Sequence, residues 1–515
     1  MWSRRQSDRL HGNHSIFGFA LAVGAFALLL RLHGLGDKPF WLDEVASLRR
    51  ATAPLPYVAA DSLHNGHYPS YFLLLWLVAK IGTSQCLLRL PSAMFGAIAA
   101  SLTYAIGARV SGLRGGIIAG LLMALSPFQV QFGQEARSYT LVSCFILTAL
   151  YGLVRLSQQP AAAALPLNKR GAPWQAWSAY GLGTAAALNV LNVAIPWFLA
   201  ANLSAPAIVR AASGAKRGFW RNWITVQLLI LAVWAPMLAL IFLRHTGSVL
   251  DGAGWVPAET GRTIWSAIAP VYLLRISSFV TFDVMPAEMP WLAFAVVAAA
   301  ALGVWRLRRD PTLLTILGCS ALVLPIGLCL VSLFVSVLVP RYFIWGAAPF
   351  FVLAGEGLAP LSATYFAAVA ASLAATGLFN LLPYYSYETK PRWDLVATKL
   401  AAMTRPGDVV LVDNYYAYTV LSVFAKRALL DQRTVRLTWQ LPDALQIAPG
   451  HDVWAVYGRT GQAAKQPTET YRVSLSALGH PVIEESVGRY IVLWRFEKPN
   501  GPEPAALTAP VNVSR

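Results

Sequence analysis

The chain is too apolar for a water-soluble protein. It has 515 residues, of which 56% are hydrophobic and 13% are charged, whereas a soluble globular chain is about 25% charged. The formal net charge is +17, from 41 Lys and Arg against 24 Asp and Glu. Because the apolar residues come in long blocks, this composition indicates an integral membrane protein beside anionic lipid and not a nucleic-acid binder. The four scattered cysteines indicate neither a disulfide framework nor a zinc site.

The first apolar run, residues 15–32, follows Arg4, Arg5 and Arg9 and is not followed by a small-residue cleavage pattern. We therefore expect a retained anchor, with residues 1–14 in the cytoplasm. Ten further runs have the roughly 20-residue length that crosses about 30 Å of hydrocarbon. They cover residues 88–108, 115–132, 138–156, 175–191, 194–211, 222–243, 288–305, 312–333, 341–359 and 362–381.

The apolar segment 69–82 is too short for a span and is predicted to be an interfacial helix. With this assignment, the basic clusters that flank the later spans fall on the same side as the basic N-terminus, as the positive-inside rule requires. Residues 34–87, the turn 133–137, residues 244–287 and the turn near Arg341 then lie on the outer face. The stretch 262–282 is either a second interfacial helix or another span.

The composition changes after the last predicted span. Three β-branched runs, at 409–412, 453–457 and 490–494, alternate with helical patterns, which predicts a small α/β domain over residues 385–498. The tail, 499–515, is rich in Pro and Ala and is predicted to be disordered. The expected fold is thus a polytopic α-helical membrane protein with about eleven transmembrane helices in residues 15–384. The odd number of spans predicts an extracytoplasmic C-terminal domain.

Two adjacent carboxylates, Asp43 and Glu44, stand about ten residues beyond the first span. Their ordinary interpretation is helix capping, since acids are favoured at helix N-termini. Other ionisable residues fall on the same predicted face, and each has an ordinary interpretation. His67 could belong to a polar turn, Glu135 and Arg137 could form a loop ion pair, and Arg341 could be a snorkelling anchor. Their agreement on one side favours a reaction at that membrane surface, because a transporter would keep ionisable groups near the midplane.

Several short motifs resemble the GT-C membrane glycosyltransferases, in particular the bacterial relatives of protein O-mannosyltransferases and of the lipid A aminoarabinose transferase. The resemblance rests on the Asp-Glu pair, the His-x-Pro-x-Tyr segment from His67 to Tyr71, Leu-Arg-Leu-Pro-Ser at 88–92, the stretch 126–139, and Pro-Arg-Tyr at 340–342. It is strongest over residues 15–160. Tyr68 departs from the pattern, since many relatives have a second proline there.

The resemblance implies transfer of a sugar from a polyprenyl-phosphate donor to an acceptor hydroxyl or amine. In this mechanism Asp43 is the base for an inverting attack, and Glu44 positions Asp43 or raises its basicity. The positive charges that meet the leaving phosphate come from Arg341, Arg137 and His67, and Glu135 orients Arg137 or a sugar hydroxyl. Tyr342, Tyr71 and Trp41 line the sugar or prenyl path, or anchor the chain in the interface. We expect no obligatory metal or other cofactor.

Two other classes of function stay open on the sequence. One is a transporter or flippase of a lipid-linked sugar, and the other is a non-catalytic envelope assembly protein. The leading hypothesis places a multi-pass enzyme in the bacterial inner membrane. Its partners are the polyprenyl-phosphate sugar, membrane lipids and an acceptor lipid, polysaccharide or protein, and no nucleic acid.

Overall fold

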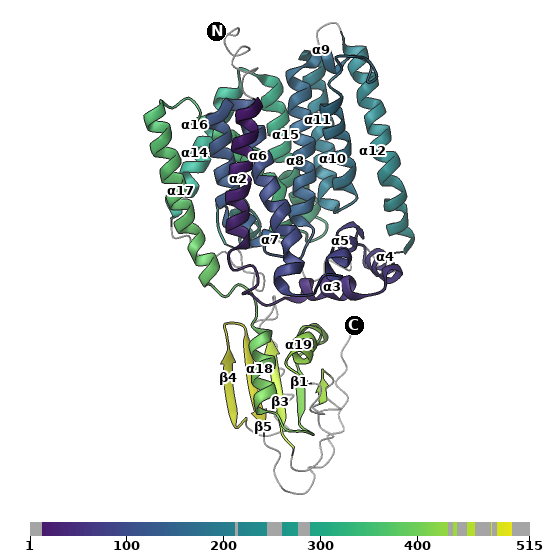
Figure 1. Cartoon of the computed structure of the whole chain (residues 1–515), viewed down its shortest axis with the longest axis vertical. Helices are drawn as coiled ribbons and strands as arrows, with labels where there is room; N and C mark the ends of the chain where they lie inside the picture. Colours follow the sequence, from purple (N-terminus) through teal and green to yellow (C-terminus); the bar gives the residue numbers. More distant parts are fainter. Residues whose placement is uncertain are drawn as a thin grey trace. The chain divides into compact units, whose positions relative to one another are not determined.

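The computed structural model describes most of the chain (Figure 1). The described residues are 13–211, 215–244, 260–276, 289–430, 436–439, 451–458, 475 and 481–496. The predicted tail 499–515 and almost all of the predicted cytoplasmic segment 1–14 lie outside them. The chain divides into two compact units, Met1–Lys390 and Pro391–Arg515, which we call the helical unit and the α/β unit. This division falls six residues after the predicted domain start at residue 385.

The elements of the helical unit in its described residues are all helices. In chain order they are α2 (Asn13–Leu32), α3 (Leu42–Thr52), α4 (Leu55–His64), α5 (Ser70–Ala79), α6 (Gln85–Leu125), α7 (Pro127–Gly133), α8 (Tyr139–Gln158), α9 (Pro160–Ala163), α10 (Trp174–Leu188), η1 (Asn192–Ala194), α11 (Ile195–Ala211), α12 (Lys216–Arg244), α13 (Gly261–Tyr272), α14 (Pro290–Leu307), α15 (Pro311–Ser332), η3 (Pro340–Gly346), α16 (Ala347–Leu358) and α17 (Ala363–Ser386). Within the described residues, seven elements are long and apolar enough to cross a membrane.

A helix lies at each of the eleven predicted spans. Two of them, 88–108 and 115–132, share the long element α6, which reverses at Gly112. The φ of Gly112 is 76°, in the region that favours glycine. The two halves of α6 then pack so closely that a Cβ on Gly107 would lie 3.0 Å from the Cα of Gly116. The element is therefore a helical hairpin, with one half at each of these two predicted spans.

Element α6 is the centre of the helical unit, since it packs against α2, α8, α16 and α17. Further out, α10 packs on α8, α11 on α15, and α14 on α16. The predicted interfacial segment forms the short helix α5, and α13 covers the first part of the predicted stretch 262–282. The rest of that stretch lies outside the described residues from 277 onward.

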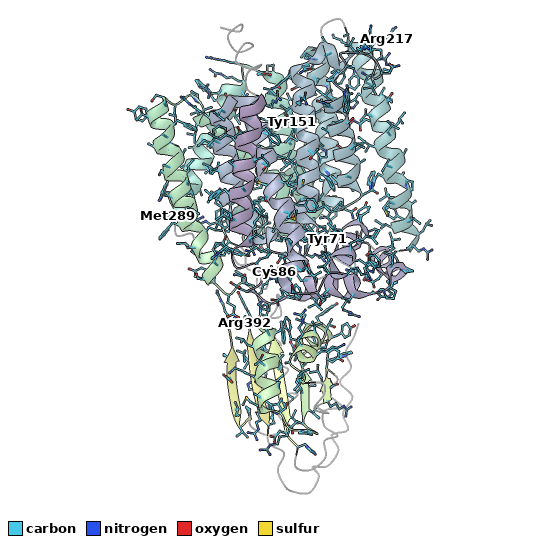
Figure 2. The ribbon with its side chains drawn as sticks, viewed as in Figure 1. Tyr71, Cys86, Tyr151, Arg217, Met289 and Arg392 are labelled. Carbon is cyan, nitrogen blue, oxygen red and sulfur yellow. The ribbon has the colours of Figure 1, made fainter. Side chains whose placement is uncertain are left out.

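The short helices α3, α4 and α5 gather at one end of the helical unit (Figure 1). Figure 2 shows Tyr71 near this end and Arg217, one of the basic residues predicted to be cytoplasmic, at the opposite end. Trp76 of α5 donates a hydrogen bond to the carbonyl of Ala53 at 3.1 Å, and Arg50 of α3 pairs with Asp61 of α4 at 2.6 Å. These contacts fix the three helices as one layer, which carries the first carboxylates of the candidate site.

The α/β unit contains α18 (Trp393–Met403), β1 (Val409–Val412), α19 (Tyr415–Arg427), β2 (Arg436–Thr438), β3 (Val453–Gly458), β4 (Ile483–Val487) and β5 (Ile491–Phe496). Among the described residues the strands form one sheet of order β2-β1-β3-β5-β4. Strand β1 is parallel to β2 and β3, and β5 is antiparallel to β3 and β4. Strands β1 and β3 are buried along their whole length, as expected for parallel strands of an α/β fold.

Candidate active site

Helix α3 presents two acidic residues, Asp43 and Glu44, in its first turn. Successive side chains on a helix point about 100° apart, so the two carboxylates enter different surroundings. Two clusters of charged side chains result. We call Asp43, His67, Arg137 and Arg341 the Asp43 cluster, and Glu44, Arg89, Glu135 and Lys390 the Glu44 cluster.

The Asp43 cluster joins three segments that are far apart in the sequence. An oxygen of the Asp43 carboxylate lies 3.6 Å from Nη2 of Arg137 and 3.9 Å from Nη2 of Arg341. Both distances are ion-pair distances but are longer than those of a hydrogen bond. The Asp43 side chain is 23% exposed, whereas those of Arg137 and Arg341 are 12% and 7% exposed. The Asp43 carboxylate is therefore more exposed than either guanidinium group.

Both arginines are held by their own segments. Arg137 lies in the turn between α7 and α8, where Ser92 Oγ donates a hydrogen bond to its carbonyl at 3.0 Å. Arg341 lies at the start of η3, which is fixed to α7 by a bond of 2.8 Å from Gln129 Nε2 to the carbonyl of Ile344. The guanidinium group of Arg341 lies against the rings of Trp41 and Tyr342, 5.7 and 5.9 Å from their centroids. These contacts place two cations at fixed positions beside one carboxylate.

The arginines also determine the charge state of the cluster. Burial opposes ionisation of Asp43, but Arg137 and Arg341 outweigh it and hold the pKa of Asp43 below its usual value. Burial, together with the nearby charges of Arg137 and Arg50, lowers the pKa of His67 to about 3. This shift favours the neutral form of His67, whereas we expect from the sequence that this side chain supplies positive charge. Two arginines and one carboxylate leave the Asp43 cluster with an excess of one positive charge.

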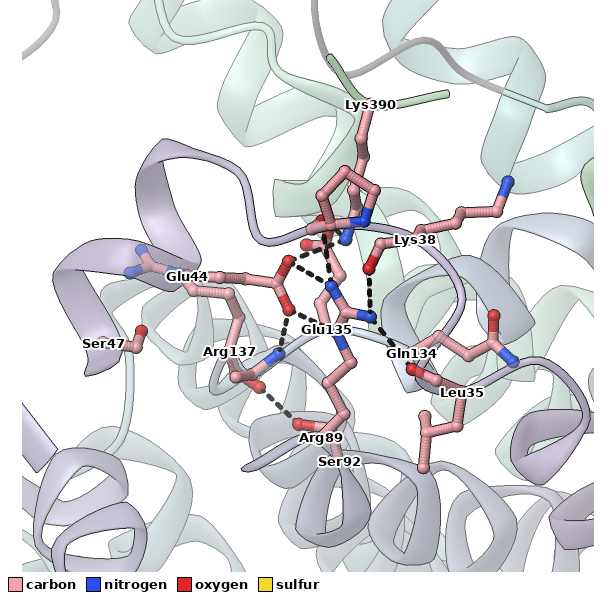
Figure 3. A network of polar contacts seen from close by, with 12 residues as sticks. Leu35, Lys38, Glu44, Ser47, Arg89, Ser92, Gln134, Glu135, Arg137 and Lys390 are labelled. Atoms are coloured by element: carbon pink, nitrogen blue, oxygen red, sulfur yellow. Dashed lines mark hydrogen bonds and ion pairs between the residues drawn. The ribbon is translucent and has the colours of Figure 1, made fainter. Parts of the chain in front are cut away.

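The side chains of the Glu44 cluster are 0–2% exposed, and Figure 3 shows the polar contacts among them. The Glu44 carboxylate, which is 0% exposed, accepts hydrogen bonds from Arg89 at 2.7 and 2.9 Å and from Lys390 at 2.8 Å. It accepts another from the backbone N–H of Ala136 at 3.0 Å. Arg89 also donates to the carbonyls of Leu35, Lys38 and Pro39. Glu44 thus ties α3, the start of α6, the α7–α8 turn and the segment after α17 together.

The second carboxylate of this cluster, Glu135, is also 0% exposed, and one of its oxygens lies 3.2 Å from Nζ of Lys390. Burial raises the pKa of Glu135, and the nearby carboxylate of Glu44 adds to the effect. Glu44 shows the opposite shift. Burial opposes its ionisation, but Arg89 and Lys390 outweigh the burial and hold its pKa below its usual value. The two carboxylates of the cluster therefore shift in opposite directions, with Glu44 the more readily ionised of the two.

The structure separates the predicted site residues into two groups. It brings Asp43, His67, Arg137 and Arg341 together, with Tyr342 against Arg341. It places Glu44 and Glu135 in the other cluster, and the Glu135 carboxylate is paired with Lys390 and not with the Arg137 guanidinium. Tyr71 is 1% exposed and its hydroxyl lies 2.6 Å from Ser92 Oγ, so it supports the serine that donates to the Arg137 carbonyl.

Three residues of this region, Arg89, Gln134 and Lys390, are absent from the predicted site. Arg89 stands within the Leu-Arg-Leu-Pro-Ser motif, as a single charge at the start of an apolar run. Gln134 donates to the carbonyls of Arg31 and His33 and accepts a hydrogen bond from Tyr384. Lys390 stands among other charged residues after the last span, Glu388, Arg392 and Asp394. A lone charge beside a membrane segment is the pattern that could have identified Arg89, because such a charge needs a partner, but no such pattern singles out Lys390.

Within the part of the chain that the structure describes, no three His, Cys, Asp or Glu side chains gather closely enough to hold a metal ion. The polar groups that converge on the Asp43 cluster are guanidinium groups, a carboxylate and an imidazole. Guanidinium groups bind phosphate and carboxylate oxygens, often through two parallel hydrogen bonds. The chemistry of the cluster therefore suits an anionic group next to a proton acceptor.

No protein-family model matches the sequence, and no curated protein sequence matches it. Several solved structures, however, match the fold of this chain. The apo structure of ArnT from Cupriavidus metallidurans aligns with a TM-score of 0.56 and 14% identity, over 93% of this chain and 98% of that one. The same enzyme bound to undecaprenyl phosphate aligns with a TM-score of 0.53 and 14% identity, over 94% and 99%.

A third match is the oligosaccharyltransferase AglB from Archaeoglobus fulgidus, in complex with an inhibitory peptide and a dolichol-phosphate. It aligns with a TM-score of 0.51 and 11% identity, over 95% of this chain and 75% of that one. At these identities the likeness concerns the fold. The chain therefore shares the fold of ArnT and AglB, in agreement with the fold that its sequence motifs led us to expect.

Proposed function

We propose that this protein is a membrane glycosyltransferase that transfers a sugar from a polyprenyl-phosphate carrier to an acceptor at the outer face of the bacterial inner membrane. The observation that carries the proposal is the Asp43 cluster, in which one partly exposed carboxylate lies 3.6 and 3.9 Å from two fixed arginines. The fold supports it, since ArnT and AglB have been solved with undecaprenyl phosphate and a dolichol-phosphate.

The charges of the cluster fit the reaction. The donor is a phosphodiester with one negative charge, and the lipid phosphate that leaves is a monoester with a second. Arg137 and Arg341 supply fixed positive charge where this second charge develops, which is the kind of electrostatic stabilisation that contributes most to catalysis. The excess positive charge of the empty cluster also attracts the anionic donor.

Asp43 is the candidate base. The acceptor oxygen or nitrogen forms a bond to the anomeric carbon while the bond from that carbon to the phosphate oxygen breaks, with inversion. Asp43 takes the acceptor proton and later releases it to water. The arginines lower the basicity of Asp43 in the empty site. A bound phosphate neutralises them, so the same carboxylate becomes a stronger base when the donor is present.

In this proposal Glu44 has a structural role. All its hydrogen bonds go to Arg89, Lys390 and the backbone of Ala136, and its side chain is 0% exposed. It does not touch the reacting groups, but it fixes the first turn of α3 and so the position of Asp43. We infer that Glu44 is a positioning residue and not a second base.

The test is transfer by the purified full-length protein in nanodiscs. The donor is undecaprenyl phosphate carrying a radiolabelled sugar, taken from a panel of hexoses, N-acetylhexosamines and aminopentoses, and cell-envelope extract supplies the acceptor. Asp43→Asn is expected to lower kcat by about 10²–10⁴-fold, the usual contribution of a general base. The matched control is Asp37→Asn, an exposed acid in the same loop, which keeps full activity. Undiminished transfer by Asp43→Asn would remove Asp43 from the mechanism.

A further inference from the structure

The α/β unit has a group of exposed aromatic side chains that its core does not use. Tyr415, Tyr416 and Trp439 are 48%, 65% and 42% exposed. The ring of Tyr415 lies 5.8 Å from that of Trp439, 6.2 Å from that of Tyr416 and 6.4 Å from that of Tyr418. We call Tyr415, Tyr416, Tyr418 and Trp439 the aromatic patch. Contiguous exposed aromatic side chains are uncommon on a protein surface and mark interaction sites.

The aromatic patch lies where the sheet topology favours ligand binding. Strand β1 stands between β2 and β3, and it is parallel to both. The chain passes from β1 through α19 to β2 on one side and then to β3 on the other, so its order reverses at β1. Trp439 directly follows β2, and Tyr415 begins α19 three residues after the last residue of β1. In open α/β sheets, ligands bind outside the carboxyl ends of the strands at such a reversal.

Polar groups stand at the same strand ends. Asp413 directly follows β1, and its backbone N–H bonds to the carbonyl of Val456 in β3 at 3.1 Å. One oxygen of the Asp413 carboxyl accepts a hydrogen bond from Asn414 at 2.9 Å. The other oxygen is buried and has no hydrogen-bond partner in the described part of the chain. Burial also raises the pKa of the Asp413 carboxyl to about 7.

We propose that the aromatic patch, together with Asp413, binds the saccharide portion of the acceptor. The inference rests on the proposed function, since it names the acceptor as a glycan or a glycolipid. A sugar ring presents C–H groups on one face and hydroxyls at its edge. The C–H face stacks on the negative face of an aromatic ring, and edge hydroxyls form hydrogen bonds with the half-buried polar side chains of Asp413 and Asn414.

The composition of the patch favours a saccharide over a lipid surface. Its described members are tyrosine and tryptophan beside Asp413 and Asn414. Surface segments that bind membranes combine aromatic and aliphatic residues with Lys and Arg on the polar side. The basic residues of α19, Lys426 and Arg427, lie in its last turn, at the far end of the helix from Tyr415. Tyrosine and tryptophan rings beside polar side chains suit an uncharged, hydroxyl-rich ligand.

The test measures saccharide binding separately from transfer. Full-length protein in nanodiscs is titrated with maltotetraose and with chitotetraose, and binding is followed by saturation-transfer NMR. Trp439→Ala and Tyr415→Ala are expected to weaken binding at least about tenfold, as expected when a stacked aromatic ring is removed. Asp413→Asn keeps the shape and is expected to weaken binding by a smaller factor. The matched control is Met403→Ala, an exposed side chain at the end of α18, which binds as the wild type does.

The outcomes separate this inference from the proposed function. Asp43→Asn should abolish transfer and leave saccharide binding unchanged. If the wild type transfers sugar but binds neither tetrasaccharide, or if Trp439→Ala binds as tightly as the wild type, the saccharide site is refuted and the glycosyltransferase proposal stands. If the tetrasaccharides bind through the patch but no donor is ever consumed, the site stands as a saccharide-binding surface and the transferase proposal fails.

Discussion

Asp43 and Glu44 are neighbours in one helical turn, yet their surroundings differ in every respect that matters for chemistry. Glu44 is 0% exposed and is held by hydrogen bonds of 2.7 to 3.0 Å. Asp43 is 23% exposed and stands 3.6 and 3.9 Å from its two arginines. A carboxylate with all its hydrogen bonds satisfied is a structural element, because a substrate would have to displace every partner. A carboxylate with looser partners leaves room for a substrate group.

The comparison also explains why the two acids stand next to each other. A residue that takes part in a reaction must be held within a fraction of an ångström of its working position. Asp43 has few direct supports, but the adjacent Glu44 is tied to Arg89, Lys390 and Ala136. The rigid cluster therefore fixes the turn that carries the reactive carboxylate.

The largest effect is expected when the Glu44 cluster is broken. Glu44→Gln leaves Arg89 and Lys390 without their shared carboxylate, and removing one partner of a buried ion pair costs about 3–5 kcal/mol. We expect a large fall in Tm and a parallel loss of transfer, measured by thermal unfolding in detergent. The control is Glu485→Gln, whose carboxylate pairs with Lys399 at the surface and is 39% exposed. A surface pair contributes about 0–1 kcal/mol, and equal Tm changes in both variants would contradict the distinction.

A smaller effect, on catalysis alone, is expected at the arginines. Arg137→Gln and Arg341→Gln each remove one cation from the leaving phosphate, which should lower kcat/KM for the donor by about 10²–10³-fold. Tm should change little, because neither guanidinium group anchors the Glu44 cluster. Lysine at either position should restore only part of the activity, since it lacks the planar fork of arginine.

The matched control for these variants is Arg49→Gln, an exposed arginine on the same helix as Asp43. It should leave kcat/KM unchanged. A similar loss in Arg49→Gln would mean that net charge attracts the donor and that the positions of Arg137 and Arg341 are unimportant.

The smallest effect is a shift in pH dependence. In the empty site the arginines hold the pKa of Asp43 below its usual value, and a bound phosphate weakens their effect on the carboxylate. The acidic limb of kcat, which reports the donor complex, should therefore lie at higher pH than the acidic limb of kcat/KM, which reports the free enzyme. Steady-state rates from pH 3 to 7, a range of about 4 units that spans the ordinary carboxyl pKa, measure both. Coincident limbs would show that the donor phosphate does not contact the arginines.

Much of the fold is predictable from the sequence because the bilayer restricts what can cross it. Length and apolar composition predict a helix at each of the eleven span positions, and β-branched runs predict β1, β3 and β5. The short strand β2 and the strand β4, which has Glu484 and Glu485 in its centre, are not predicted. Edge strands with polar side chains have no apolar pattern of their own, and only their neighbours in the sheet define them.

The candidate site was predictable only in part. Asp43, Arg137 and Arg341 could be grouped, because the topology places the ends of their spans on one side of the membrane. The opposite roles of Asp43 and Glu44 could not be inferred, since they depend on Arg89 and Lys390, which lie 45 and 346 residues away from Glu44 in the sequence. The lowered pKa of His67 likewise depends on burial and on Arg137 and Arg50, which no local pattern reveals.

The most direct test is a structure of the full-length protein in nanodiscs with undecaprenyl phosphate, determined by cryo-electron microscopy. The account predicts phosphate density within hydrogen-bonding distance of the guanidinium groups of both Arg137 and Arg341, beside the Asp43 carboxylate, while Glu44 keeps its bonds to Arg89 and Lys390. Phosphate bound at another position, with the Asp43 cluster unchanged and empty, would contradict it.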